Sequence, residues 1–210
     1  MRSFILFCTF LIFPLAVQAQ FSIGVNIMGL SYHLKQQANA QLYPYRIDGG
    51  GRMVVVSGIQ LTIDVPLYRY DGYQADDYMD DNYVGIQAAV ALFQDCIRKT
   101  AGFFHIGARG YAQRDRHAFG ISFGPAWFVR QSWSSLSGYV DEGLFADTGR
   151  LQHSFYWYGG GLEHMYYLSE EIAVSTHLIP GIPEVLVLSS GMRITPSRTW
   201  INDLRVASTN

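Results

Sequence analysis

Residues 83–94 read YVGIQAAVALFQ. Val84 and Ile86 alternate with Gly85 and Gln87, and the alternation of large apolar with small or polar residues runs to the end of the stretch. Successive side chains of a β-strand point to opposite faces. A period of two residues therefore predicts a strand that has one apolar face and one small or polar face.

The same alternation recurs along the chain in segments of roughly ten residues, the length expected of strands that cross a bilayer. Eight segments follow it: 21–27, 58–65, 84–92, 104–109, 119–130, 154–168, 172–179 and 185–194. The pattern predicts an all-β chain with eight antiparallel strands. Two architectures accommodate it, a secreted soluble barrel or sandwich and a barrel that spans the outer membrane.

The second face of the strands favours the membrane barrel. A soluble barrel would carry Lys and Glu on that face, but it holds mainly Gly, Ala, Ser and Gln. Only 15% of the residues are charged, against about a quarter in soluble domains. Tyrosines sit near the segment ends, as in the aromatic girdles of outer-membrane barrels. We therefore expect an eight-stranded antiparallel transmembrane β-barrel in a bacterial outer membrane.

Composition excludes other classes of protein. Aromatic residues make up 15% of the 210 residues, which argues against disorder. Lys and Arg number 15 against 17 Asp and Glu, so the chain lacks the basic footprint of a nucleic-acid binder. We expect no nucleic-acid partner and a monomer.

The first residues have the features of a secretory signal. A basic Arg2 precedes an apolar run of about 14 residues, too short to span a bilayer, and Val17 and Ala19 stand at the two positions where a signal peptidase reads small residues. We expect a signal peptide at 1–19, the barrel at 20–195 and a polar tail at 196–210. Removal of Cys8 with the signal leaves Cys96 as the single thiol, so no internal disulfide is expected.

Strand order places the candidate functional residues at one end of the barrel. With the first strand starting in the periplasm, the connections at 31–52, 95–100, 132–151 and 180–184 lie outside the cell. The polar, aromatic or backbone-breaking residues that stand out all fall at those strand ends: His33, Asp95, Cys96, Arg130, Trp133, Pro180 and Gly181.

Three of these residues have the chemistry of a nucleophilic site. Cys96 is a candidate nucleophile, His33 its base, and Asp95 the group that orients the imidazole. Neighbouring residues of a regular strand face opposite sides, so Asp95 and Cys96 act together only if the chain leaves strand geometry there. The alternative is structural, with Cys96 a small buried apolar residue and His33 a polar group at the rim.

Arg130 and Pro180 also have two interpretations each. Arg130 is either a phosphate clamp or a lumen arginine paired with a carboxylate such as Glu163 or Asp64. Pro180 removes a ladder hydrogen bond, and so marks either a simple strand end or a weak seam through which a lipid enters the lumen.

The sequence predicts no metal site and no cofactor. His105, His164 and His177 are scattered along the chain. The acidic stretch around Asp76 and Asp80 lacks the ligand spacing and glycine of a calcium loop.

The segments that carry the candidate residues resemble the lipid A palmitoyltransferase (PagP-like) family of eight-stranded outer-membrane barrels. That family has a His after its first strand, an Ala-Phe-Lys-Asp-Ser segment, an Arg-Asp-Asn-Trp segment and a Tyr-Ile-Pro-Gly segment. The matching stretches are 32–33 (YH), 92–96 (LFQDC), 130–133 (RQSW) and 178–181 (LIPG), and 191–194 (GMRI) is similar to the family's closing Trp-Met-Arg-Phe.

The resemblance implies an acyltransferase that takes an acyl chain from a phospholipid donor and passes it to a lipid A acceptor. It places His33, Asp95 and Cys96 at the family's catalytic His, Asp and Ser, with Arg130, Trp133 and Pro180 in the substrate region. Cys in place of Ser is the chief departure. Two alternatives stay open: a lipid hydrolase on the same barrel, and a barrel without enzymatic activity that binds ligands through its outer loops.

Overall fold

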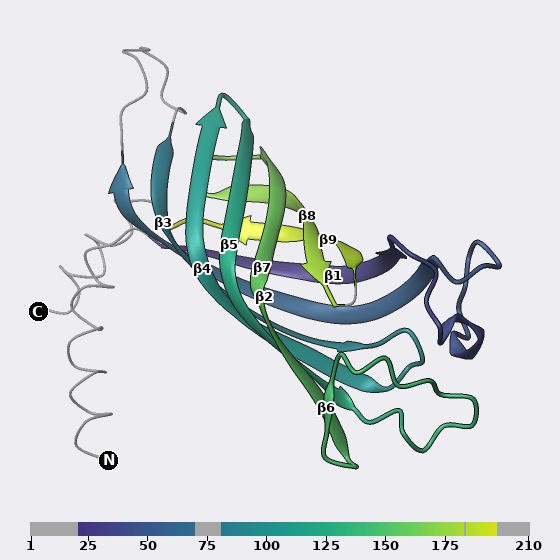
Figure 1. Cartoon of the computed structure of the whole chain (residues 1–210). Helices are drawn as coiled ribbons and strands as arrows, with labels where there is room; N and C mark the ends of the chain where they lie inside the picture. Colours follow the sequence, from purple (N-terminus) through teal and green to yellow (C-terminus); the bar gives the residue numbers. More distant parts are fainter. Residues whose placement is uncertain (1–20, 70–80, 183, 197–210) are drawn as a thin grey trace, which may run out of the picture.

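The computed structural model describes residues 21–69, 81–182 and 184–196. Eight long strands make up the barrel, and Figure 1 follows them in chain order. They are β1 (Ser22–His33), β2 (Met53–Arg69), β3 (Asn82–Gln94), β4 (Thr100–Arg114), β5 (His117–Gln131), β7 (Leu151–Tyr167), β8 (Ile172–Gly181) and β9 (Val185–Ile194). A two-residue strand, β6 (Ala146–Asp147), and a 3-10 turn, η1 (Ala40–Leu42), lie in the two longest connections.

Every strand pairs antiparallel with its neighbours, and two pairings close the barrel. β1 pairs with β9 as well as with β2, and β5 pairs with β7. The predicted eight-stranded antiparallel barrel is confirmed. No helix among the described residues is long and apolar enough to cross a membrane.

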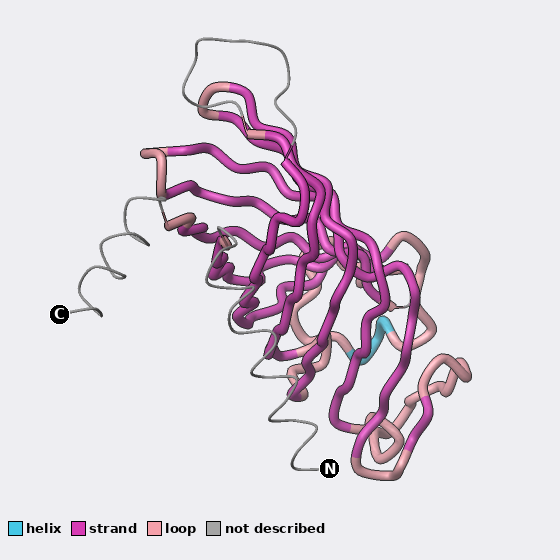
Figure 2. Tube along the Cα trace, turned by 90° about the vertical axis from the view of Figure 1, so that its left-hand side faces the viewer, coloured by secondary structure: helices cyan, strands magenta, loops and turns pink. Residues whose placement is uncertain are grey.

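The connections after β1, β3 and β5 gather at one end, which we call the loop end. Figure 2 shows them together with the helical turn η1. The predicted boundaries differ by a few residues, because β1 continues to His33 and β8 to Gly181. The predicted signal peptide, most of the predicted tail and Asp76 and Asp80 of the acidic stretch lie outside the described residues.

The strand faces are sorted as the alternation predicts. Ile27 on β1 is 68% exposed, whereas its neighbour Asn26 is fully buried in the lumen. Exposed apolar side chains follow the same alternation on the other strands, including Ile59 and Leu61 on β2 and Phe123 on β5. The outer wall is thus apolar, as a surface that faces lipid must be.

The lumen is filled in three layers. An apolar layer that includes Met28, Val56 and Phe103 lies toward the loop end, and a tyrosine-rich layer lies at the opposite end. Between them lies a buried charged layer. The expectation of a lumen lined mainly by small residues is therefore wrong for its middle.

The charged layer joins two arginines to two carboxylates. Arg193 contacts both Asp64 and Glu163, Arg109 contacts the same two residues, and His177 Nε2 lies 2.9 Å from Glu163. Glycine makes room for it, because a Cβ on Gly120 would overlap the guanidinium of Arg109. The small lumen residues therefore leave space for buried charges.

The seam between β7 and β8 is paired over only part of its length. Residues 162–167 of β7 pair with 173–178 of β8. Toward the loop end, residues 154–161 of β7 and 179–181 of β8 have no partner strand on their facing edges in the described part of the chain, and the two strands diverge in Figure 1. The wall between β7 and β8 is therefore open near the loop end.

Candidate functional site

A pocket opens into the barrel at the loop end and has the apolar layer as its floor. It holds about 840 Å³ of empty space, its open mouth included. Its lining contains all the residues singled out in the sequence: His33, Asp95, Cys96, Arg130, Trp133, Pro180 and Gly181. The structure thus brings together residues from four separate strand ends and the connections that follow them.

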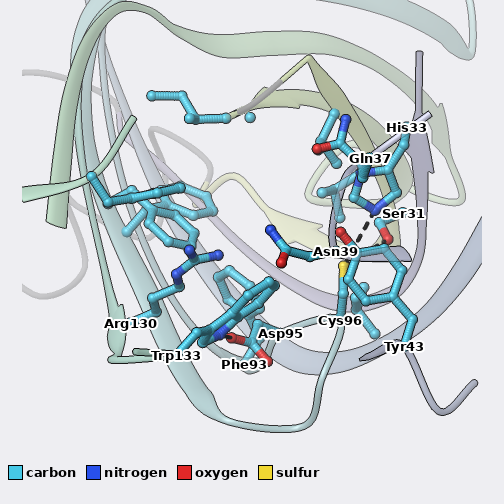
Figure 3. A pocket seen from close by; sticks show the side chains of 18 of the residues that line it. Ser31, His33, Gln37, Asn39, Tyr43, Phe93, Asp95, Cys96, Arg130 and Trp133 are labelled. Atoms are coloured by element: carbon cyan, nitrogen blue, oxygen red, sulfur yellow. Dashed lines mark hydrogen bonds between the residues drawn. The ribbon is translucent and has the colours of Figure 1, made fainter. Parts of the chain in front are cut away.

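His33 and Cys96 meet inside this pocket. His33 Nε2 lies 3.3 Å from Cys96 Sγ, although the two residues are 63 positions apart in the sequence. The imidazole is buried and stacks on the Tyr43 ring, with centroids 5.4 Å apart. Figure 3 shows the pair with Ser31, whose hydroxyl lies 3.7 Å from the same sulfur. This geometry lets a thiol give its proton to a base.

A tight turn after β3 aims the thiol at the pocket. The amide N–H of Asp95 donates to the Lys99 carbonyl, and Asp95 Oδ1 accepts from the amides of Ile97 and Lys99. Arg98 adopts a left-handed conformation with φ of 69°. Because the chain has left strand geometry, Asp95 and Cys96 both line the same pocket.

Asp95 does not orient the imidazole, which corrects the expected triad. Its Oδ2 accepts a hydrogen bond of 2.7 Å from Trp133 Nε1, and its Oδ1 is taken by the turn. His33 Nδ1, the atom that an orienting carboxylate would hold, is buried without a hydrogen-bond partner. The site is a Cys–His pair beside an Asp–Trp pair.

Burial sets the ionisation of the thiol. Loss of hydration raises the pKa of the Cys96 thiol to about 12, although the hydrogen bond with Ser31 opposes the shift. Burial also raises the pKa of the Asp95 carboxyl, against the hydrogen bonds from Trp133 and the turn amides. The site therefore carries a protonated thiol at neutral pH, and this sulfur could act as a nucleophile only after losing its proton.

Arg130 occupies the opposite wall of the pocket. Its guanidinium carbon lies 3.7 Å from the centre of the Trp133 ring and 3.9 Å from that of Phe145, and its Nε donates to Gln152 at 2.8 Å. Its terminal nitrogens point into the pocket (Figure 3). Of the two interpretations of Arg130, pairing with Glu163 or Asp64 is wrong, because both carboxylates are held by Arg109 and Arg193.

Pro180 lies where the seam between β7 and β8 opens. It pairs with Leu186 of β9 and faces no strand on its other side in the described chain. A proline costs least at such an edge, because the hydrogen-bond donor that it lacks has no acceptor there. Tyr156 of β7 lines the pocket from across the opening.

Two loops form a roof over the pocket. The Asn39 side chain donates to the Val140 carbonyl at 2.9 Å and accepts from the Val140 amide at 2.8 Å. Gln41 adds a hydrogen bond to the Gly138 carbonyl. The loop after β1 is thereby fastened to the loop after β5 on the axial side of the pocket.

Several residues of the site escape prediction from sequence. Ser31 is an exception that does carry a signal, because it lies two residues before His33 on the same inward face of β1. Tyr43, Phe145 and Gln152 carry none, because they come from loops or strand ends whose path depends on the folded structure. Among the described residues no group of three or more His, Cys, Asp or Glu is placed to hold a metal ion.

No family model matches the sequence, and no curated protein matches it. Among solved structures the chain is similar to Ail, the attachment invasion locus protein of Yersinia pestis. In its complex with the heparin analogue sucrose octasulfate, Ail is 12% identical with a TM-score of 0.41, over 84% of this chain and 97% of Ail. A second Ail structure gives 11% and 0.37 over the same shares. Likeness at this level bears on neither a ligand nor an activity of this chain.

Proposed function

We propose that the protein is an outer-membrane acyltransferase that moves an acyl chain from a phospholipid to lipid A or a related outer-leaflet lipid. The observation that carries this proposal is the 3.3 Å contact between His33 and Cys96 inside a pocket with an apolar floor. The exposed apolar wall of the barrel supports a position in the membrane, with the loop end outside the cell.

The open seam between β7 and β8 gives the donor lipid a route. It lies at the loop end, level with the outer leaflet, and the pocket is lined from both sides of it by Tyr156 and Pro180. The loop roof held by Asn39 covers the axial side. An acyl chain would therefore enter sideways through the open seam and lie on Met28 and Phe103 of the apolar layer.

The pair His33 and Cys96 then performs two half-reactions. His33 Nε2 takes the thiol proton while Cys96 Sγ attacks the ester carbonyl carbon of the donor. The ester C–O bond breaks, and the lysolipid oxygen leaves with the proton from His33. In the second half-reaction an acceptor hydroxyl gives its proton to His33 and its oxygen attacks the thioester. The C–S bond breaks and Cys96 regains its proton.

Arg130 supplies a charge for an anionic headgroup. Both faces of its guanidinium are covered by aromatic rings, and no carboxylate of the described residues forms an ion pair with it. The edge with the terminal nitrogens stays free for two oxygens of one phosphate, the geometry that guanidinium favours.

Mass spectrometry of lipid A from expressing cells tests the transfer. We expect the wild type and the control Lys35→Gln, which alters an exposed residue near the same strand end, to add one acyl chain to lipid A. Cys96→Ala and His33→Ala should abolish the addition. Removal of a chain in place of addition would identify a hydrolase, and unchanged lipids in all four strains would contradict both enzymatic functions.

A second candidate is a barrel that binds an amphiphile without chemistry. The protonated thiol and the engagement of Asp95 by Trp133 favour it. In that case Cys96→Ala would retain a co-purifying lipid as fully as the wild type, and lipid A would be identical in strains with and without the protein.

A further inference from the structure

Two histidines meet on the outer wall, at the end of the barrel opposite the pocket. His117 begins β5, directly after the turn that joins it to β4, and His164 lies on the neighbouring strand β7. Cross-strand pairing sets His117 against Tyr166 and Phe119 against His164, so the two imidazoles are diagonal neighbours on one face. The sequence separates them by 47 positions, and the barrel closure brings them together.

The distance between their nitrogens is that of two ligands on one metal ion. His117 Nδ1 and His164 Nε2 are 3.2 Å apart. Two imidazole nitrogens bound to one ion at about 2.0–2.1 Å are separated by roughly 2.9 Å at a right angle and roughly 3.4 Å at a tetrahedral angle. The ring centroids are 5.5 Å apart with an interplanar angle of 27°.

Two features fit the pair for an ion. His117 is exposed and His164 is half-buried, so an ion in solution can reach both imidazoles, and the ion would replace the hydrogen bond that now joins them. The Tyr166 and Phe119 rings flank the pair, with centroids 5.1 Å from His117 and 4.9 Å from His164. A neutral imidazole binds an ion through one nitrogen and keeps its proton on the other.

We propose that His117 and His164 form a binding site for a divalent transition-metal ion of the class that prefers imidazole, Cu²⁺, Ni²⁺ or Zn²⁺. No third His, Cys, Asp or Glu of the described residues joins them, so water completes the coordination shell. The ion bridges β5 and β7, and it stabilises the folded barrel because the unfolded chain does not hold the two imidazoles together. The site is independent of the pocket and of its chemistry.

Titration of the untagged, detergent-refolded barrel with CuCl2, NiCl2, ZnCl2 and MgCl2 tests the site. We expect saturable binding of one Cu²⁺ per chain, weaker binding of Ni²⁺ and of Zn²⁺, none of Mg²⁺, and a rise in melting temperature with Cu²⁺. His117→Ala and His164→Ala should each weaken Cu²⁺ binding at least tenfold and remove the rise.

The matched control is His153→Ala, which removes a histidine on β7 that stacks on Trp127 and not on another imidazole. It should bind Cu²⁺ as the wild type does. An equal loss in all three variants, or retention of binding in both His117→Ala and His164→Ala, would overturn the proposal, as would a wild type that binds no ion. Heat-dependent gel mobility shows that each variant is folded, so a lost site is separable from a lost barrel.

Discussion

At the scale of residues, the site is defined by what surrounds the Cys96 sulfur. The thiol has His33 at 3.3 Å and Ser31 at 3.7 Å, in a setting that disfavours the thiolate. In the proposed reaction, activation of the thiol therefore depends on the transfer of its proton to His33 at the moment of attack. A preformed ion pair is not available.

The pH dependence of thiol alkylation tests this description. Because burial raises the pKa of Cys96 to about 12, the thiol is neutral below that pH and the thiolate fraction grows about tenfold per pH unit. The iodoacetamide rate of the refolded barrel should therefore still be climbing at pH 10. A plateau between pH 7 and 9 would show a stabilised thiolate and contradict the assignment.

Trp133 supports two other residues of the site. Its indole donates to Asp95 at 2.7 Å and its ring covers Arg130. Trp133→Phe keeps a ring but leaves a buried carboxyl oxygen without this donor, which costs about 1–3 kcal/mol. We expect urea unfolding to show a loss of that size. An unchanged midpoint would mean that water replaces the indole.

At the scale of elements, the strands were predictable and the connections were not. Alternation in residues 83–94 identifies both faces of β3 without any knowledge of its neighbours. The loop containing Asn39 and the loop containing Val140 have no such period, and their contact depends on the closed barrel. The same reason explains why the sequence wrongly predicts that Asp95 orients the His33 imidazole. The hydrogen-bond partner of Asp95, Trp133, lies in another connection.

The roof over the pocket depends on the side chain of Asn39. Asn39→Ala removes both hydrogen bonds to Val140, each worth roughly 1 kcal/mol. The loops should separate more often, and the Val140 amide should exchange its hydrogen about tenfold faster or more. Hydrogen exchange with mass readout on the segment 138–142 measures this. Amides in β3 serve as the internal control. Equal exchange of the Val140 amide in both proteins would show that the Asn39 hydrogen bonds do not hold the two loops of the roof together.

At the scale of the whole molecule, the barrel has an apolar outer wall and a lumen whose middle is filled by paired charged side chains. The alternation predicts which residues face inward, including Arg109, Glu163 and Arg193. It does not predict which of them pair, because lumen partners lie across the barrel and not along a strand. For this reason the sequence left Arg130 as a candidate partner of Glu163, while the structure assigns Glu163 to Arg109 and Arg193.

The charged layer should carry a large share of the stability. Glu163→Gln leaves Arg193 and Arg109 with Asp64 as their remaining carboxylate, and breaking such a buried pair typically costs about 3–5 kcal/mol. Glu184→Gln breaks the exposed pair with Lys35, which is worth about 0–1 kcal/mol. Urea unfolding in detergent should separate the two variants clearly. Similar losses would mean that water fills the lumen.

The proposed reaction requires that Cys96 accept an acyl group from a phospholipid. Intact-mass analysis of the barrel after incubation in phospholipid vesicles without lipid A tests it most directly, because no acceptor is present to complete the transfer. We expect the wild type to gain the mass of one acyl chain on Cys96, hydroxylamine to remove it, and Cys96→Ala to gain nothing. A wild-type protein whose mass stays unchanged in vesicles, and whose expression leaves lipid A unaltered, would contradict it.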